Sequence, residues 1–435
     1  VNEHVPTKLD TKGGVEITQY EGHTVADMGL LKMDFLGLSN LTIIHDTLKN
    51  IEANGKPAID YTKIPLDDAE TYKLMSRGDT LGVFQLDSDG MRSLLKTLKP
   101  DNFNDISALI ALYRPGPMDF IPQYIRGKND SSSITYDCPQ LEPILAPTYG
   151  CIVYQEQVMQ IVRDLAGYSL GRSDLLRRAM SKKKAAVMEK ERKIFIYGDE
   201  ETGVPGCIKN GIDEQTANKI YDEMIDFAKY AFNKSHAAAY AVVSYQTAWL
   251  KYYYPVEFMA ALMTSVIDNP GKVSEYIYSC RQMGIKILPP DINKGEGSFS
   301  VDGGNIRYGL AAIKSIGKPV IESIIQERKN GGEFSNLKDF IERLSGKEVN
   351  KRTIESFIKS GAFDGLGGTR KQFMVVYVQI LDQVNRERKY SMTGQLSLFD
   401  IVSDDQKSEF DIPLPDVGEY EKETKLAFEK EVLGV

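Results

Sequence analysis

An ammonium and a carboxylate lie two residues apart in a short apolar segment near the start of the chain. Residues 30–38 read LLKMDFLGL. If 31–35 form a strand, Lys32 and Asp34 point to one face, because side chains alternate along a strand. Such a pair suits phosphoryl transfer, in which the carboxylate binds a divalent cation and the ammonium steadies a phosphate. The alternative is a surface strand with a charged outer face, which the spacing taken alone favours.

Basic residues also stand at the expected ends and faces of helices. Arg114 follows the helical run 104–113 and precedes Pro115, which cannot continue a helix, so we expect its guanidinium to project freely. Arg177 and Arg178 belong to the string LLRRAMSKKK, in which Arg178 and Lys182 are four residues apart and share a helix face. Taken singly, such residues are equally typical of a solvated basic face.

Two further helix starts carry polar or aromatic groups. Residues 150–157 read GCIVYQEQ, and a helix is expected to begin after Tyr154. Residues 232–240 read FNKSHAAAY, so Lys234, Ser235 and His236 lie beside the start of a long helix. Unpaired N–H groups at a helix start favour anions. The alternative in both places is a capped core helix without a ligand.

The charge of the chain is unevenly distributed. The net charge of the 435 residues is −8, yet residues 172–193 contain nine Lys or Arg against three Asp or Glu. Residues 401–435 have the opposite bias, with ten acidic residues against four Lys. A basic segment of this kind allows an acidic chain to bind phosphates locally.

The composition excludes two classes of protein. No run of 18 apolar residues is present, so a membrane span is not expected, and no basic-then-apolar leader predicts secretion. The four cysteines are scattered, which indicates free thiols in a reducing cytoplasm rather than disulfides or zinc ligands.

Apolar periodicity predicts a mainly α, multi-helical fold with small β elements. Strand signals are confined to 15–20 and to 299–308, where Asp302-Gly303-Gly304 predicts a hairpin turn. The helical runs are 41–51, 69–75, 106–112, 158–165, 220–232, 237–254 and 258–267. Breaks near 37–40, 288–297 and 390–415 suggest domain boundaries, and 309–328 and 349–368 suggest two copies of a helix-turn-helix unit.

Several strings together resemble the bacterial DNA polymerase III α subunits, the C-family of replicative polymerases. They occur in that family's order over essentially the whole chain: LLKMDFLGL, GVFQLDSDGM, ALYRPGPM, YGCIVYQEQVMQI, LLRRAMSKKK, FNKSHAAAYAVVSYQTAWLK and ILPPDIN. The resemblance implies the end of the palm at 1–38, fingers at 39–290, a helix-hairpin-helix-containing domain at 291–390, and a linker with a clamp-binding motif and the start of a next segment at 391–435.

The resemblance also assigns roles to the residues above. Asp34 would be a metal-binding carboxylate for Mg²⁺ in the complete polymerase, and Lys32 would contact the phosphates of the incoming dNTP. The fingers would surround this nucleotide and the primer-template DNA with Arg114, Tyr154, Arg177, Arg178, Lys182, Lys234, Ser235 and His236. Other replicase subunits would be its partners, in the cytoplasm.

Two motifs in the last third of the chain suggest further contacts. AAIKSIG at 311–317, followed by a helical run, exposes backbone N–H groups that can hold a phosphate. The resemblance implies that Ser315, Gly317 and Lys318 grip duplex DNA without reading its sequence. GAFDGLG at 361–367 resembles a second hairpin. QLSLF at 395–399 is similar to the family's sliding-clamp motif, with Gln395, Leu398 and Phe399 as anchors. The alternative is that this segment folds back onto its own domain.

Two-metal catalysis needs several carboxylates around the metal ions, and before Asp34 this sequence lacks the motif that would supply two of them. The family's Asp-x-Asp pair does not precede Asp34, since Asp10 and Asp27 each stand alone. We therefore expect a DNA-directed DNA polymerase as the parent protein, and no activity from these 435 residues alone. A noncatalytic, clamp-tethered DNA-binding module remains the main alternative, and a purely structural helical protein is a third.

Overall fold

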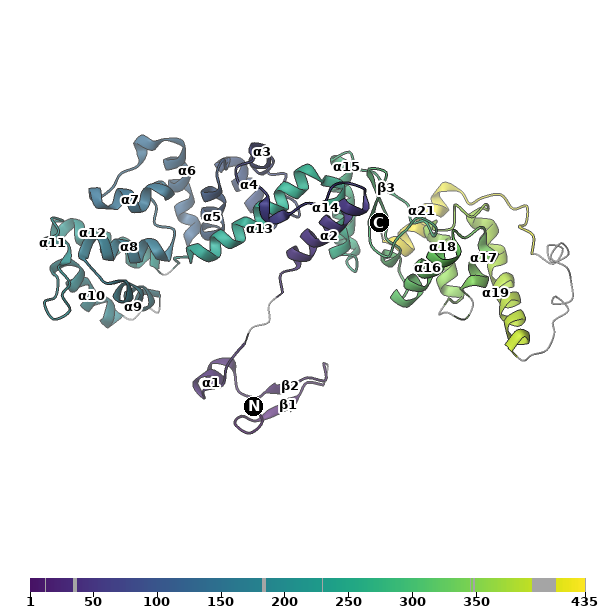
Figure 1. Ribbon diagram of the computed structural model, residues 1–435, viewed down its shortest axis with the longest axis horizontal. Helices are drawn as coiled ribbons and strands as arrows, with labels where there is room; N and C mark the ends of the chain where they lie inside the picture. Colours follow the sequence, from purple (N-terminus) through teal and green to yellow (C-terminus); the bar gives the residue numbers. More distant parts are fainter. Residues whose placement is uncertain are drawn as a thin grey trace. The chain divides into compact units, whose positions relative to one another are not determined.

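The structure is a computed structural model that describes residues 1–11, 13–33, 37–181, 185–228, 230–344, 346, 349–392 and 412–434. The chain forms two compact units, Val1–Ser39 and Asn40–Val435 (Figure 1). Most described residues are helical and the sheets are small, so the predicted fold class is confirmed. No helix in the described ranges is long and apolar enough to cross a membrane.

The first unit contains a short antiparallel ribbon and one helix. β1 (Thr7–Leu9) pairs with β2 (Glu16–Thr18), with Thr7 opposite Thr18, and this confirms the strand expected in 15–20. The Thr7 hydroxyl donates to the Glu16 carboxylate at 2.6 Å, and α1 (Gly22–Asp27) begins where the Glu21 carboxylate accepts its first N–H groups.

The second unit is built mainly from helices. Between residues 39 and 282 these are α2 Ser39–Ala53, α3 Ala69–Ser76, α4 Asp89–Leu98, α5 Phe103–Leu112, α6 Ile121–Asn129, α7 Glu142–Leu145, α8 Gln155–Ala166, α9 Leu170–Ser181, α10 Ala185–Tyr197, α11 Gly206–Lys209, α12 Glu214–Ala228, α13 Lys234–Tyr253, α14 Pro255–Ser265 and α15 Pro270–Gln282. Side-chain caps define several of their starts, since Asp68, Asn102 and Asn233 each accept an N–H from the first turn of the helix that follows.

The helical runs expected from the sequence agree with these helices to within three residues, with one exception. The run 220–232 is wrong at its end, because α12 stops at Ala228 and residues 230–233 leave the helix. The physical reason is a competing backbone pairing. The N–H of Gln155 donates to the carbonyl of Phe232 at 2.9 Å, and Tyr154 and Phe232 form an isolated parallel bridge.

Three hydrophobic cores hold the second unit together. One gathers α3 to α6 with α13 as far as Ala248, a second lies among α7 to α12, and the third runs from α2, α14 and α15 into the C-terminal helices. Helix α13 contributes Ala237, Ala241 and Ala248 to the first of these cores and Leu250 to the third (Figure 1). The small alanine side chains of α13 allow it to pack closely against α5. This packing fixes the positions of the helix ends that lie near the start of α13.

A three-stranded sheet precedes the C-terminal helices. β4 (Ser300–Asp302) and β5 (Asn305–Arg307) form the expected hairpin, and β3 (Ile287–Leu288) pairs in parallel with β5. Gly303 and Gly304 have φ of 57° and 85°, the backbone that a two-residue hairpin turn of this kind requires. The hairpin prediction is confirmed.

The C-terminal helices pack on the third core. They are α16 Lys318–Gly331, α17 Leu337–Arg343, α18 Lys351–Ser360, α19 Arg370–Met392 and α21 Lys422–Leu433. The suggested two copies of one helix-turn-helix unit are wrong, because one 3₁₀ turn (Leu310–Ala312) precedes α16 in the first segment, whereas a full helix, α18, occupies half of the second.

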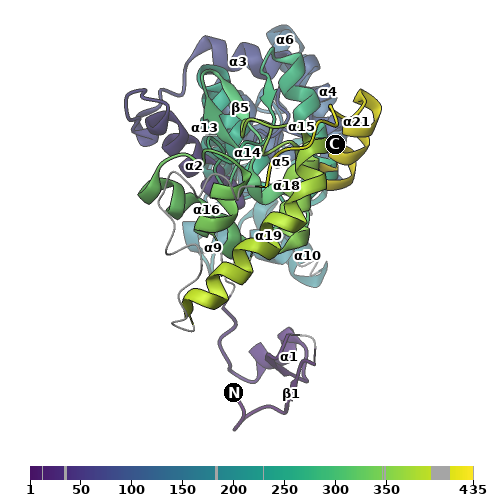
Figure 2. The same ribbon diagram turned by 90° about the vertical axis from the view of Figure 1, so that its right-hand side faces the viewer.

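The described part of the last segment returns to this domain. Helix α21 lies beside α18 (Figures 1 and 2), with Val432 and Leu433 buried. The N–H of Lys314 donates to the carbonyl of Val432 at 2.8 Å, and Glu429 pairs with Arg370 at 2.8 Å.

All four cysteines are free thiols, as the sequence predicts, and the structure shows that all four are buried. Burial raises the pKa of the Cys151, Cys207 and Cys280 thiols to about 12. At neutral pH these thiols are therefore protonated and poorly nucleophilic.

Candidate nucleotide and nucleic-acid interface

Most of the described finger residues singled out from the sequence converge on one crossing of the chain. We call residues 153–156 and 230–234, which are joined by the Tyr154–Phe232 bridge, the crossing. Besides the backbone bond from Gln155, its side-chain amide donates to the carbonyl of Ala231 at 3.0 Å. The crossing thereby joins the start of α8, the end of α12 and the start of α13.

Arg114 reaches the crossing from the end of α5. Its Nη2 donates to the carbonyl of Tyr230 at 2.7 Å, its Nε donates to Ala111, and its guanidinium lies 4.4 Å from the Phe232 ring centre. Burial lowers the pKa of Arg114 from its ordinary value. The expectation of a freely projecting guanidinium is wrong, because two carbonyls and one aromatic ring hold it.

The loop after Arg114 fits closely against the same segment. Gly116 has a φ of 101°, and a Cβ added there would lie 2.6 Å from the Tyr230 ring. Both the backbone conformation and the space therefore require glycine at this position.

Tyr154 is the residue that precedes α8, and its side chain points into the protein. It is 3% exposed, its hydroxyl donates to Ser107 Oγ at 3.0 Å, and burial raises the pKa of the phenol to about 12. Its ring, and not its hydroxyl, lies near a cation of the proposed interface, because Lys234 Nζ is 5.6 Å from the ring centre. In this conformation the buried side chain of Tyr154 packs under the backbone of the crossing, and neither face of its ring is open to a ligand.

Helix α9 contributes Arg177 and Arg178, which share the carboxylate of Asp174. Arg177 binds Asp174 at 2.7 Å and donates to Gln155 at 3.0 Å, so it is tied to the crossing. Arg178 binds the other oxygen of Asp174 at 2.8 Å, yet 63% of its side chain is exposed. Lys182, the third cation assigned to this face, lies outside the described residues.

Carboxylates neutralise much of the basic segment 172–193. Arg172 pairs with Glu191 at 3.1 Å, and Arg192 pairs with Asp222. The described cations that remain well exposed, besides Arg178, are Lys190 and Lys193. Four of the six described cations of this segment are therefore paired with carboxylates.

The start of α13 carries the most exposed group of the proposed residues. Lys234, Ser235 and His236 are all exposed, and the His236 ring lies 4.2 Å from the ring of Tyr240, one turn further along α13. An exposed imidazole backed by a second ring is a surface on which a base can stack.

Sequence reasoning missed Glu156, whose carboxylate binds the start of α13. Its carboxylate accepts the N–H of Lys234 at 2.9 Å and the amide of Asn233 at 3.0 Å. The anion expected beside these N–H groups is thus already supplied by the protein. The only signal in the sequence was a carboxylate in the first turn of α8, and nothing in it identifies a partner 78 residues away.

The residues of the expected catalytic strand are only partly described. Residues 31–33 have no strand conformation, so the strand over 31–35 is wrong for its described part, and Leu31 and Met33 are exposed instead of half-buried. Neither β1 nor β2 pairs with these residues, so they lack the neighbour that a strand needs. Lys32 is exposed in the first unit, and Asp34 lies outside the described residues. No cluster of three His, Cys, Asp or Glu suited to a metal occurs among the described residues.

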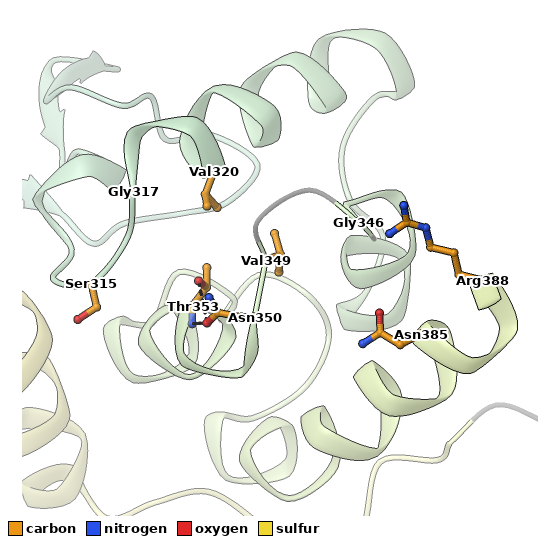
Figure 3. Close-up of a pocket in the computed structure, with 9 residues that line it drawn as sticks. All are labelled: Ser315, Gly317, Val320, Gly346, Val349, Asn350, Thr353, Asn385 and Arg388. Atoms are coloured by element: carbon orange, nitrogen blue, oxygen red, sulfur yellow. Dashed lines mark hydrogen bonds between the residues drawn. The ribbon is translucent and has the colours of Figure 1, made fainter. Parts of the chain in front are cut away.

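A separate cavity of about 620 Å³ lies between α16, α18 and α19 (Figure 3). Ser315 and Gly317 line it, together with Asn350 at the start of α18 and Asn385 and Arg388 of α19. Ser315 has a φ of 70°, Gly317 begins α16 without a side-chain cap, and Lys318 is exposed. The proposed duplex-binding residues therefore stand at an open helix start on one side of this cavity, and Arg388 lies on the opposite side, next to Gly346 (Figure 3). The clamp-motif residues Gln395, Leu398 and Phe399 lie outside the described residues.

Comparison with known proteins finds family models that match two parts of this chain. Residues 40–203 match the family model of the bacterial DNA polymerase III alpha subunit finger domain, and residues 284–373 match a model of the helix-hairpin-helix motif. The chain thus combines a polymerase finger domain with a helix-hairpin-helix region.

Individual relatives extend the match to nearly the whole chain. The DNA polymerase III subunit alpha of Thermus aquaticus is 44% identical over 99% of this chain and 34% of its own length. Those of Mycobacterium tuberculosis (strain CDC 1551 / Oshkosh) and Escherichia coli (strain K12) are 44% and 45% identical over 100% and 93% of this chain, and over 37% and 35% of their own lengths. The chain spans about a third of the length of these curated relatives. The resemblance found in the sequence is confirmed: this chain corresponds to a part of the bacterial DNA polymerase III alpha subunit.

The close fit between Gly116 and Tyr230 gives a stability prediction. We expect Gly116→Ala to lower the free energy of unfolding by about 2–4 kcal/mol, because it adds backbone strain and a collision with the ring. Gly211→Ala, at a φ of 83° with nothing within 4 Å, serves as the strain-only control and should cost about 1 kcal/mol. Urea denaturation measures both. In a Tyr230→Ala background the cost of Gly116→Ala should fall toward that of the control, and an undiminished cost would disprove the collision.

Proposed function

We propose that this chain forms the fingers and the duplex-binding region of a replicative DNA-directed DNA polymerase. The observation that carries the proposal is the convergence of Arg114, Tyr154, Arg177 and the 234–236 stretch on one crossing, in a chain 44% identical to polymerase subunits. These residues lie in or beside α5, α8, α9 and α13, which are spread over residues 103–253. Such a nucleotide-binding surface would form only after these separate elements have folded together.

The contacts divide the proposed finger residues into two groups. Lys234, Ser235, His236 and Arg178 are exposed and would touch the incoming dNTP or the template strand. Arg114, Tyr154 and Arg177 are already engaged with the protein and would hold the exposed group in place. Lys182 would extend the first group.

The remaining regions are proposed to follow the polymerase order. Residues 1–38 would end the palm, 39–290 form the fingers, and 291–390 bind duplex DNA through Ser315, Gly317 and Lys318. Residues 391–435 would include the sliding-clamp motif. Asp34 would be one ligand of the Mg²⁺ ions and Lys32 would contact a phosphate, as in two-metal phosphoryl transfer.

The polymerase assignment is tested in the protein that contains this chain. We expect Asp34→Asn to lower the rate of nucleotide incorporation by about 10³-fold or more, because a metal ligand loses its charge, while binding of primed DNA stays nearly unchanged. Asp27→Asn, at the end of α1, is the matched control and should retain activity. Primer extension and a DNA-binding titration measure the two effects. Normal incorporation by the Asp34→Asn protein would remove Asp34 from the metal site.

The DNA-binding assignment is tested with the chain itself. We expect binding of primed duplex DNA to weaken steeply with salt, because each neutralised phosphate releases counterions. Arg178→Ala combined with Lys318→Ala should reduce the slope of log K against log salt by about 2, since each lost contact changes it by roughly 0.9. Lys73→Ala, which removes an exposed lysine paired with Glu70, should leave the slope unchanged. An unaltered slope in the double variant would count against both contacts.

The clamp assignment is tested with a peptide of residues 392–402. We expect it to bind the sliding clamp of the same organism, and Leu398→Ala with Phe399→Ala to reduce affinity by two or more orders of magnitude, because burial of each side chain contributes about 1.5–3 kcal/mol. Ser397→Ala is the control. In the whole chain the double substitution should leave the melting temperature unchanged. A lower melting temperature together with a peptide that does not bind would identify Leu398 and Phe399 as core residues.

A further inference from the structure

A small cavity lies beside the start of α13, between α5, α7 and α8. Its volume is about 110 Å³, well below the roughly 300–1,000 Å³ of pockets that enclose a whole small molecule. It therefore suits one planar ring rather than a complete nucleotide. Lys234, which belongs to the exposed stretch proposed to touch a nucleotide or the template, also lines this cavity. The cavity is thus continuous with the proposed interface.

Two prolines and an isoleucine form its apolar wall. Pro143 and Pro147 are exposed, and Ile144, which lies between them in the sequence, is 3% exposed. The buried amide of Gln157 holds this wall in place, because its nitrogen donates to the carbonyl of Ile144 at 3.2 Å and to the hydroxyl of Thr148 at 2.8 Å. The wall is therefore organised before a ligand arrives, so binding requires little ordering of the protein.

Three polar side chains around the cavity are available to a ligand. The amides of Asn104 and Gln160 have no hydrogen-bond partner among the described residues. Lys234 has no ion pair with any residue that the structure describes. Glu156 also lines the cavity, but its carboxylate already accepts hydrogen bonds from the amide of Asn233 and from the N–H of Lys234. The cavity therefore offers two amides and one ammonium.

These groups select the chemistry of the occupant. A bare phosphate would meet Lys234 together with the carboxylate of Glu156, and an apolar group would leave the two amides without partners. A nucleobase meets both demands, because its faces pack on the prolines while donors and acceptors on its edge bind the amides of Asn104 and Gln160. Its phosphate then lies at Lys234, the cation beside the cavity.

We propose that this cavity receives an unpaired base of the single-stranded template. This inference rests on the proposed function and names the ligand of one part of that surface. The base of an incoming dNTP must pair with the template, so its edge is unavailable to the amides, whereas an unpaired base presents its edge freely. Each amide carries both donors and an acceptor, so hydrogen bonding in the cavity does not select one base over another.

The cavity is tested by titrating the 435-residue chain with dTMP, whose base is a single ring. The isoleucine methyl groups are ¹³C-labelled, and the signal of Ile144 is followed by NMR. We expect a saturable shift of this signal with a Kd of the order of 1–10 mM, because one ring buries little area. Deoxyribose 5-phosphate, which has the sugar and the phosphate without the base, should give no saturable shift. Equal shifts with both compounds, or no saturable shift with dTMP, would overturn the proposal.

Amide variants assign the effect to the polar side of the cavity. Asn104→Ala with Gln160→Ala removes two hydrogen-bonding groups and should weaken dTMP binding at least about fivefold. Gln140→Ala, which removes an exposed amide outside the cavity, is the matched control and should bind as the parent does. Gln160→Ala alone is the second variant if the double substitution alters the methyl spectrum of the free protein. Unchanged dTMP affinity in a variant with a native spectrum would rule out the amide contacts.

A single strand separates this proposal from the proposed function. Oligothymidylate should shift the Ile144 signal, and its duplex with oligodeoxyadenylate should not, because paired bases cannot enter the cavity. A shift that persists in the duplex would contradict the proposal. Binding of primed DNA that weakens steeply with salt, without any shift of Ile144 by dTMP, would remove the base cavity and leave the polymerase assignment intact. A dTMP shift in a chain that binds no DNA would instead exclude the template as the occupant.

Discussion

The finger region depends on one short backbone pairing between segments almost 80 residues apart. The bond from Gln155 N–H to the Phe232 carbonyl ends α12, allows α13 to begin, and places the start of α8 beside both. Arg114 and Arg177 then bind the same crossing from two other helices. Because buried backbone groups must find partners, the local helix preference of residues 230–232 yields to this pairing. Without it, the basic and aromatic residues of the proposed interface would have no common location.

Carboxylates from within the protein determine how the cations of this region are presented. Asp174 holds two arginines, Glu191 holds Arg172, and Glu156 accepts the first N–H group of α13. Apart from Arg178, the side chains of these pairs are only partly exposed, and ion pairs near the surface contribute little to stability, typically about 0–1 kcal/mol. Their main effect is to restrict rotamers, so that a charged ligand meets side chains that are already oriented.

Local signals in the sequence were enough for much of the fold. Periodic apolar residues, the Asn233 cap and the Gly303-Gly304 turn each act within a few residues, and the structure agrees with the elements they predict. The site was harder to predict from the sequence, because its residues contact partners that are far away along the chain. Arg114 binds Tyr230, and Lys234 binds Glu156. No spacing rule identifies those pairs, so a free guanidinium and an open helix start were expected. The strand over 31–35 depended on a neighbouring strand that 31–33 lack here.

Helix α21 packs against α18. The undescribed segment 393–411 is therefore attached at both ends to the same helix-hairpin-helix region, at Met392 on one side and through the contacts of Val432 and Glu429 on the other. A protein bound between these two attachments would be tethered on both sides, and its local concentration beside this region would stay high whatever its intrinsic affinity.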